Sequence, residues 1–287
     1  MVRCHRAIFL SIYCTRGSHI LYLQKFLHII SSERTDIRNA PLAPTFAQHQ
    51  KAYSFCIPYI AGKKVLEIGC GSSYGTKRLA AQAKQIMAFD TDKITVNELR
   101  STIIPPNVQL FCEDFTKHHF DTKFDAIISL QVIEHAPNPT YFLEALRKVL
   151  KPDGVVILST PNAITQSYNE NPYHYKEYQP QELYYLLQPF FRSIHLYGLQ
   201  GDAMVSAYEA HRKQIVLNIL RKDFLKLRRL LPRPAKQFLG DIATYLARTL
   251  VQKKQTMAIT EENYTISQHT KDTIDLIAVC KLQETDN

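Results

Sequence analysis

The chain has 287 residues, enough for one large domain or two small ones, and it needs no disulfide or metal staple to bury a core. Hydrophobic residues make up 45% and charged residues 21%, as in an ordinary globular protein, and no apolar run approaches the ~18–20 residues of a membrane span. The formal net charge of +9 comes entirely from residues 210–254, which carry twelve basic and two acidic side chains, so the rest of the chain is nearly neutral.

Residues 1–45 are predicted to be an N-terminal helical extension. The start "MVRCHRAIFLSIYC" has basic residues and a short apolar stretch, like a weak targeting peptide. No small-residue cleavage pattern follows it, which favours an extra helix or a start codon placed too far upstream. The six cysteines show no paired spacing, which argues against a disulfide framework or a metal site and favours a reducing, cytoplasmic location.

Residues 46–200 are predicted to form an α/β core. Continuous apolar runs are separated by segments with helical periodicity. Such continuous runs are typical of strands that are covered on both faces of a parallel sheet. We therefore expect a Rossmann-like, doubly wound sheet of seven strands. The expected strands are 64–68, 85–89, 108–112, 124–130, 154–160, 193–199 and 274–280.

A glycine-rich loop, "GCGSSYG", directly follows the first strand, "KVLEI". A strand, glycine loop and helix in this order point backbone N–H groups at a ligand. The nicotinamide fingerprint requires a third glycine where Tyr74 stands, which disfavours a nicotinamide-dependent oxidoreductase. A phosphate-binding Walker loop is excluded because no Gly-Lys-Ser/Thr follows.

Five motifs in chain order resemble those of class I S-adenosylmethionine (SAM) methyltransferases. They are "VLEIGCG", the acid that closes "IMAFD", the acid of "CEDF", and the fourth and fifth strands with their loops, "SLQVIEHAPNP" and "GVVILSTPN". The last two are closely similar to ubiquinone-biosynthesis O-methyltransferases. The resemblance covers residues 50–200 and the last strand, and it implies SAM as the cofactor.

The resemblance also implies roles for individual residues. Asp90 would bind both ribose hydroxyls and Asp114 the adenine amine, while Gln131 and Glu134 would line the methionine end. One carboxylate can accept from two vicinal hydroxyls, and each charge-assisted bond is worth ~1.5–3 kcal/mol. Both aspartates also suit helix N-caps or turns. The full expected set of cofactor-binding residues is Glu67, Gly69, Cys70, Gly71, Asp90, Asp114 and Gln131.

Two residues, one in the first strand and one in the glycine loop, are expected to carry an energetic cost. Glu67 is an acid inside an apolar strand, which is costly unless it is paired, and a core lysine is one possible partner. The family often has a third glycine at the position of Ser73. If the backbone there has a positive φ, serine costs of order 1 kcal/mol and weakens the cofactor site.

An oxygen acceptor benefits from a general base, and histidine is the usual candidate. His135 follows the fourth strand directly, and His174 lies on a Tyr-, Asn- and Lys-rich loop that could cover the site. We expect either of them to assist deprotonation of a hydroxyl, although both also suit structural roles. His118 and His119 are expected to be solvated loop residues.

Residues 201–262 are predicted to be a basic helical insertion before the last strands, in residues 263–287. This insertion is expected either to cover the acceptor pocket or to contact an anionic membrane surface peripherally through residues 210–254. Nucleic-acid binding is disfavoured because the segment has few aromatic residues. The sequence thus predicts a SAM-dependent methyltransferase for a small-molecule, lipid, quinone or glycan acceptor, with a non-catalytic SAM-binding protein as the alternative.

Overall fold

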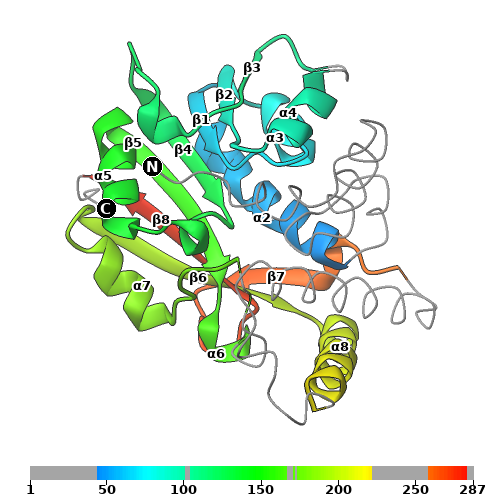
Figure 1. Cartoon of the computed structure of the whole chain (residues 1–287). Coiled ribbons are helices and arrows are strands. Elements are labelled where there is room, and N and C mark those ends of the chain that lie inside the picture. The colour runs from blue at the N-terminus through cyan, green and yellow to red at the C-terminus, as the bar shows by residue number, and fades with distance from the viewer. Residues whose placement is uncertain (1–43, 101–103, 167–170, 172, 222–257, 283–287) are drawn as a thin grey trace, which may run out of the picture.

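The computed structural model of the protein describes residues 44–100, 104–166, 171, 173–221 and 258–282 (Figure 1). The predicted N-terminal extension and most of the predicted insertion lie outside these ranges, so their boundaries stay predictions. Among the described residues, eight strands form one sheet in the order β3-β2-β1-β4-β5-β8-β6-β7. No helix in the described part of the chain is long and apolar enough to cross a bilayer.

Each of the seven predicted apolar runs forms a strand, and the doubly wound α/β class is confirmed. The prediction of seven strands was wrong by one, because β7 has only four residues and lies at the sheet edge, where it pairs with β6 alone. β8 also runs antiparallel to both β5 and β6. The strands are β1 (Lys64–Ile68), β2 (Gln85–Phe89), β3 (Val108–Phe111), β4 (Phe124–Leu130), β5 (Leu150–Pro161), β6 (Ser193–Gly201), β7 (Tyr264–Ser267) and β8 (Asp275–Lys281).

Helices follow the strands as the periodicity predicts, and local signals set their starts. The Asn138 side chain accepts a hydrogen bond from Tyr141 N–H, with Pro139 in the first turn, which begins α5. The helices are α2 (Pro44–Ile60), α3 (Tyr74–Ala80), α4 (Lys93–Arg100), α5 (Pro139–Val149), α6 (Ala163–Gln166), α7 (Pro180–Leu187) and α8 (Ala203–Arg221), with short 3-10 turns η3 (Phe115–Lys117), η4 (Ile133–His135) and η5 (Glu261–Asn263).

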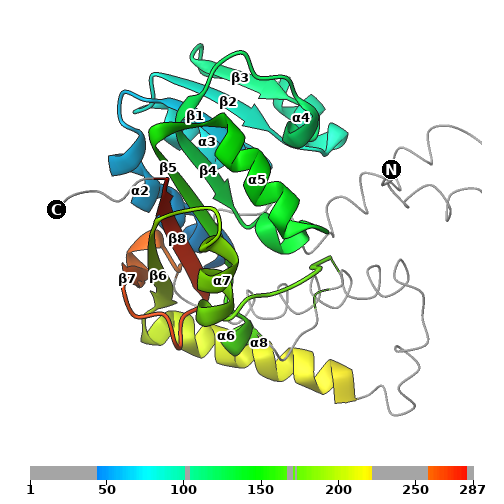
Figure 2. The same cartoon turned by 90° about the vertical axis from the view of Figure 1, so that its left-hand side faces the viewer.

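Both faces of the sheet are covered, which gives two apolar cores. Helices α5 and α7 pack on one face, where Leu143 and Leu183 are fully buried (Figure 2). Helices α2 and α3 pack on the other face, where Ile60 and Leu79 are fully buried. This two-sided burial explains why the strands read as continuous apolar runs, and it leaves the carboxyl ends of the parallel strands to carry polar groups.

His118 corrects one expectation, because it is not a solvated loop residue. Its ring packs edge-on against Phe89, Phe111 and Phe120, and its Nδ1 lies 2.8 Å from Glu113 Oε1. His119, next to it, has a side chain that is 92% exposed, as expected. The aromatic surface of the β2 and β3 ends therefore partly covers one histidine of the pair and leaves the other in water.

Candidate active site

The glycine loop joins the end of β1 to the start of α3 and is bonded to the end of β2. The backbone N–H groups of Gly69 and Cys70 both donate to Phe89 O, at 2.8 and 3.1 Å. Gly71 has a φ of +50°, and a side chain built there would meet no atom within 4 Å. Glycine therefore meets a backbone requirement at this position and keeps the space beside the loop open.

Asp90 ties the end of β2 to this loop. Its Oδ2 accepts a hydrogen bond from Gly71 N–H at 2.9 Å, and its Oδ1 accepts from Asp92 N–H at 2.8 Å. A carboxylate offers about four acceptor positions, so these two bonds orient it and leave capacity for further donors. The side chain is thus held at the open side of the loop, at the carboxyl edge of the sheet.

Glu67 is completely buried behind the loop, and its partners are hydroxyls, not the core lysine that was considered. Tyr53 of α2 donates its hydroxyl to Glu67 Oε1 at 2.9 Å. Burial raises the pKa of Glu67 from its ordinary 4.5 to about 7, and the charge of Asp90 adds to this effect, while the hydroxyls of Thr76 and Tyr53 oppose it. A carboxyl this close to neutral pH makes the loop sensitive to protonation.

Two further predicted positions lie on the turns after β3 and β4. Asp114 caps η3, since its Oδ1 accepts from the N–H and the hydroxyl of Thr116 at 3.1 and 2.8 Å. Gln131 has a left-handed φ of +57°, and its N–H donates to Ser159 O at 3.0 Å. A strained residue held by a neighbouring strand is typical of a functional site. The Cys70 side chain, in contrast, is buried in the core, so that residue contributes backbone only.

Comparison with known proteins agrees with this geometry. Residues 66–158 match the family model described as a methyltransferase domain. Residues 66–158 are therefore a methyltransferase domain. A probable S-adenosylmethionine-dependent methyltransferase of Mycobacterium tuberculosis is 34% identical over 147 residues, covering 50% of this chain and 53% of the relative. A ubiquinone biosynthesis O-methyltransferase of Glaesserella parasuis is 34% identical over 115 residues, covering 37% and 49%.

The chain thus spans about half the length of the curated relatives it matches. Solved structures support the fold over a longer range. The cyclase SpnF superposes with a TM-score of 0.52 at 14% identity, covering 92% of this chain and 95% of that chain. The N-methyltransferase NodS of Bradyrhizobium japonicum superposes with a TM-score of 0.50 at 15% identity, covering 62% and 91%.

The residues present fit SAM, the cofactor in the name of the mycobacterial relative. The open space at Gly71, the backbone of the loop and the Asp90 carboxylate provide a cradle, donors and an anionic acceptor along one edge. Gly75 packs so tightly on α2 that a side chain there would overlap the Tyr53 ring. The late glycine therefore brings α2 against the loop, where Tyr74 also contacts Phe46 at a ring-centroid distance of 4.9 Å.

Ser73 has the left-handed backbone that the sequence comparison with the family suggested, with φ +56° and ψ +16°. A Cβ in this region costs about 1–2 kcal/mol, partly offset by the greater flexibility of glycine in the unfolded chain. We expect Ser73→Gly to raise the free energy of unfolding by about 1 kcal/mol, measured by urea denaturation. Ser72→Gly, at a residue with no positive φ, is the matched control and should lower it. Equal effects of the two changes on the free energy of unfolding would contradict the prediction that the Ser73 backbone is strained.

The domain brings together the two predicted histidines, which come from segments 39 residues apart. Backbone bonding connects the segments, because Tyr175 N–H donates to Glu134 O at 2.8 Å. The rings of His135 and His174 are in edge-to-face contact, with centroids 4.9 Å apart. His135 Nδ1 lies 3.3 Å from Tyr173 O. A carbonyl can only accept, so Nδ1 of a neutral His135 carries the proton and Nε2 holds the lone pair.

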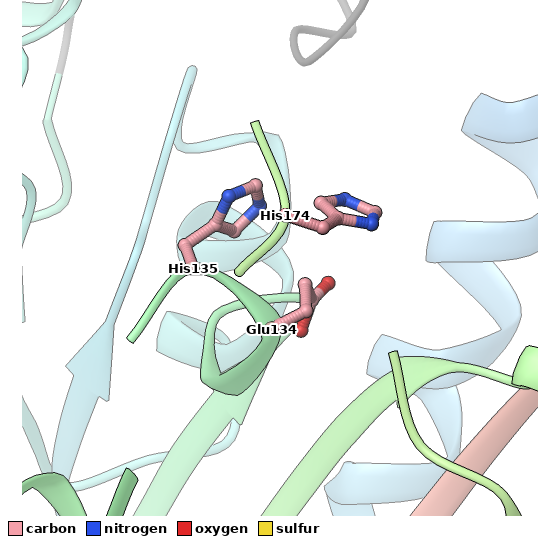
Figure 3. A group of neighbouring side chains, drawn as sticks. All are labelled: Glu134, His135 and His174. Atoms are coloured by element: carbon pink, nitrogen blue, oxygen red, sulfur yellow. The ribbon is translucent and has the colours of Figure 1, made fainter. Parts of the chain in front are cut away.

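Glu134, His135 and His174 also form a group that could hold a metal ion (Figure 3). One ligand atom from each of the three lies within 4.8 Å of the others. Tetrahedral zinc with bonds of about 2.1 Å brings its ligands to roughly 3.4 Å from one another, so the side chains would have to close in. These three residues were named from the sequence but not grouped, because His174 comes from a different loop.

Asp275, at the start of β8, is a second buried acid that we did not single out in the sequence. Its Oδ2 accepts from Gln48 Nε2 of α2 at 2.6 Å, and Gln131 also bonds to it. Burial raises its pKa from the ordinary 3.8 to about 7; Glu134 and Glu209 add to this, and the two glutamines oppose it. The signal was present in "IDLIAVC", since an acid that begins an apolar strand is as costly as Glu67.

A cavity of about 380 Å³ lies beside Asp275, at the carboxyl end of β6 and against α8. Its wall includes Ile274, next to Asp275 in the chain, and Thr165, whose hydroxyl donates to Thr273 O at 2.9 Å. The cavity thus lies at the carboxyl edge of the sheet, the edge that also carries the glycine loop. The polar side chains that line it are Thr165, Gln200, Ser206, Glu209, Lys213 and Asp272.

Proposed function

We propose that this protein transfers the methyl group of SAM to an oxygen atom of a small-molecule, lipid, quinone or glycan acceptor. The observation that supports oxygen as the methyl acceptor is the pair of histidines at the carboxyl end of β4. The Nδ1 atom of each faces a hydrogen-bond acceptor, which is Tyr173 O for His135 and Glu177 for His174. Each neutral ring therefore presents Nε2 as a base. The ubiquinone-biosynthesis relatives are O-methyltransferases by name, which agrees with this assignment.

When bound, SAM supplies an electrophilic methyl carbon and a neutral thioether leaving group. Nε2 of His135 or His174 would take the proton of the acceptor hydroxyl, and the imidazolium would later release it to water. Positioning of the reactants contributes the larger part of the rate, because alignment can supply ~7–11 kcal/mol.

We place the acceptor in the cavity between β6 and α8. Its lining combines hydroxyl, amide, carboxylate and ammonium groups, which suits a ligand rich in hydroxyls. A cytoplasmic location with peripheral membrane contact through residues 210–254 is also part of the proposal, although residues 222–257 lie outside the described residues. Within the described part, Arg212 lies 2.6 Å from Glu209 and so makes an internal ion pair.

The test uses SAM labelled on its methyl group, incubated with the purified protein and an extract of its host cell. The extract is then separated into lipid, glycan, RNA and protein fractions. Label in the lipid or glycan fraction that is lost with Asp90→Ala supports the proposal, and label in RNA or protein contradicts the acceptor class. SAM binding without any transfer supports the alternative of a non-catalytic SAM-binding protein.

The histidines make a separate prediction about the same reaction. We expect His135→Gln or His174→Gln to lower turnover at saturating SAM by about 100-fold, because a general base typically contributes 10²–10⁴. Initial rates of label transfer measure this, with His119→Gln as control, since that side chain is 92% exposed. Unchanged rates in both single variants would contradict a proton-accepting role for either ring.

A further inference from the structure

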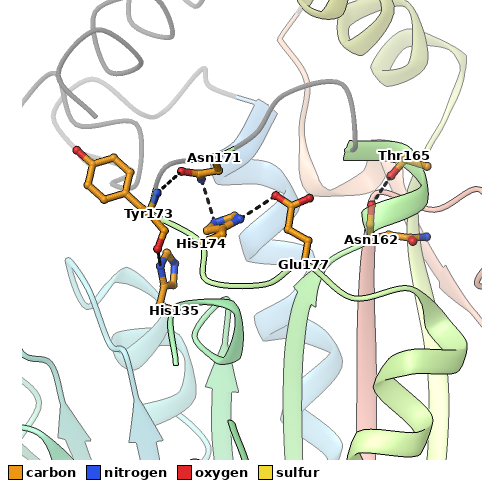
Figure 4. A network of polar contacts seen from close by, with 7 residues as sticks. All are labelled: His135, Asn162, Thr165, Asn171, Tyr173, His174 and Glu177. Atoms are coloured by element: carbon orange, nitrogen blue, oxygen red, sulfur yellow. Dashed lines mark hydrogen bonds and ion pairs between the residues drawn. The ribbon is translucent and has the colours of Figure 1, made fainter. Parts of the chain in front are cut away.

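We propose that Glu177 is a positioning residue that fixes His174 as the proton acceptor, with Asn171 as the group that the acceptor hydroxyl replaces at Nε2. This inference rests on the proposed methyl transfer to oxygen. It concerns three side chains on one short segment after β5, of which the sequence analysis singled out only His174. Figure 4 shows them in a line, with the His174 ring between the Asn171 amide and the Glu177 carboxylate.

Hydrogen bonds along this line leave one arrangement of protons. Tyr173 N–H donates to Asn171 Oδ1 at 3.0 Å, which turns the amide so that Nδ2 faces His174. Nδ2 lies 2.9 Å from His174 Nε2, and an amide nitrogen can only donate. On the other side, Nδ1 lies 2.9 Å from Glu177 Oε1, which can only accept. Nδ1 of His174 therefore carries the proton and Nε2 holds the lone pair.

The two ends of the line have different chemical roles. Glu177 is an anion with a side chain only 18% exposed, beside an imidazole that is 11% exposed. Such a carboxylate stabilises the imidazolium that forms when Nε2 takes a proton, and it holds the ring in one orientation. Asn171 is neutral, and its one bond to Nε2 is the kind that an acceptor hydroxyl can exchange with. The Glu177 side is therefore fixed, and the Asn171 side is the exchangeable one.

The two histidines differ in the partner of their Nδ1 atoms. The Nδ1 partner of His135 is a neutral carbonyl at 3.3 Å, whereas that of His174 is a carboxylate at 2.9 Å. A charged acceptor stabilises the protonated ring more strongly than a carbonyl. The geometry thus separates the two histidines, which the sequence alone left equivalent.

The first test reads the tautomer directly, without any acceptor. Histidine labelled with ¹⁵N is incorporated, and the His174 signals are identified by their loss in His174→Gln. We expect the Nδ1–H form in the unaltered protein and a mixture of tautomers in Glu177→Ala and Glu177→Gln. Glu144→Gln, at an exposed site on α5, is the control. An Nε2–H form in the unaltered protein, or an identical spectrum in Glu177→Gln with the fold intact by circular dichroism, would overturn the proposal.

The second test measures function in Glu177→Gln, which keeps the size of the side chain. We expect label transfer to fall by about 10- to 100-fold at saturating SAM, with the Kd for SAM unchanged by calorimetry. Equal loss of SAM affinity would indicate a structural role and overturn the inference. If the unaltered protein transfers no label, the proposed function fails while the tautomer result still stands.

Metal binding by Glu134, His135 and His174 is the competing role, and it has its own readout. Zn²⁺ alone is titrated into the ¹⁵N-labelled protein, and label transfer is repeated with a chelator. We expect no joint shift of the His135 and His174 signals at micromolar Zn²⁺ and no loss of rate with chelator. A rate that chelator abolishes and Zn²⁺ restores would overturn the assignment of His174 as the proton acceptor.

Discussion

Replacing Asp90 with alanine is expected to weaken SAM binding by at least about 100-fold. The proposed pair of ribose hydroxyls would lose two charge-assisted bonds, each worth about 1.5–3 kcal/mol. The loop would also lose its own restraint, because the Gly71 N–H and the Asp92 N–H both donate to this carboxylate. Both effects act in the same direction, since the cradle becomes less ordered and less polar at once.

Isothermal titration with SAM measures this directly and needs no acceptor. Asp121→Ala is the matched control, because that side chain is 90% exposed and lies away from the loop. Asp90→Asn tests the charge separately, because the side chain keeps its size while its amide NH2 group would face one of the two backbone N–H donors. An unchanged Kd in Asp90→Ala would mean that the carboxylate only bonds the loop to β2, and the predicted ribose contact would be wrong.

The free energy of unfolding is expected to fall as the pH rises from about 5 to 8. Glu67 and Asp275 have pKa values near 7 in the folded protein, raised from 4.5 and 3.8 chiefly by burial. A raised carboxyl pKa means that the folded state binds the proton more tightly. The stability it provides is therefore complete below the unfolded values and is lost as the pH rises through 7. Each group accounts for about 2–3 kcal/mol between pH 5 and pH 8.

Other acids are expected to make the free energy of unfolding rise with pH, but their effect is small. Asp125 and Glu261 have lowered pKa values, with Lys151 and Arg78 as partners, so their contribution is lost in acid. The side chains of these pairs are 27–42% exposed, and such pairs are worth about 1 kcal/mol or less. We therefore expect Glu67 and Asp275 to determine how the free energy of unfolding changes between pH 5 and 8. The two ion pairs should affect it only below about pH 4.

Urea denaturation at several pH values tests this, with Glu67→Gln and Asp275→Asn as the informative variants. Each removes one titrating group, so each should reduce the fall in stability between pH 5 and 8 by about half. Glu144→Gln, exposed on α5, should leave the slope as it is. A slope that persists in the double variant would show that other groups titrate, and the assignment to these two carboxyls would be wrong.

The fold by itself leaves the chemistry of the acceptor open. SpnF, which is named as a cyclase, and NodS, an N-methyltransferase, both share the architecture at 14–15% identity. Function on such a fold depends on the side chains at the carboxyl edge of the sheet. For this chain those are the two histidines with Glu177 and the polar cavity beside Asp275, and the experiments above concentrate on them.

Local patterns determined the core elements, and the resemblance of five motifs to methyltransferases implied the cofactor. A strand, a glycine loop and a helix are predicted from neighbouring residues, and acids such as Asp90 are placed by the ends of strands in the same sheet. The left-handed backbone of Ser73 was raised as a condition by the same resemblance, because the family often has glycine at that position. These features depend on backbone geometry within a few residues, so the local sequence pattern predicts them.

Only the tertiary structure decided which side chains meet. Tyr53 reaches Glu67 because Gly75 lets α2 pack on the loop, and Gln48 reaches Asp275 across 227 residues. β7 pairs too briefly to give a periodic signal, and the His118 ring packs against rings from two strands. Each of these contacts depends on how separate elements pack, so its energy is a property of the assembled core that no local stretch of sequence contains.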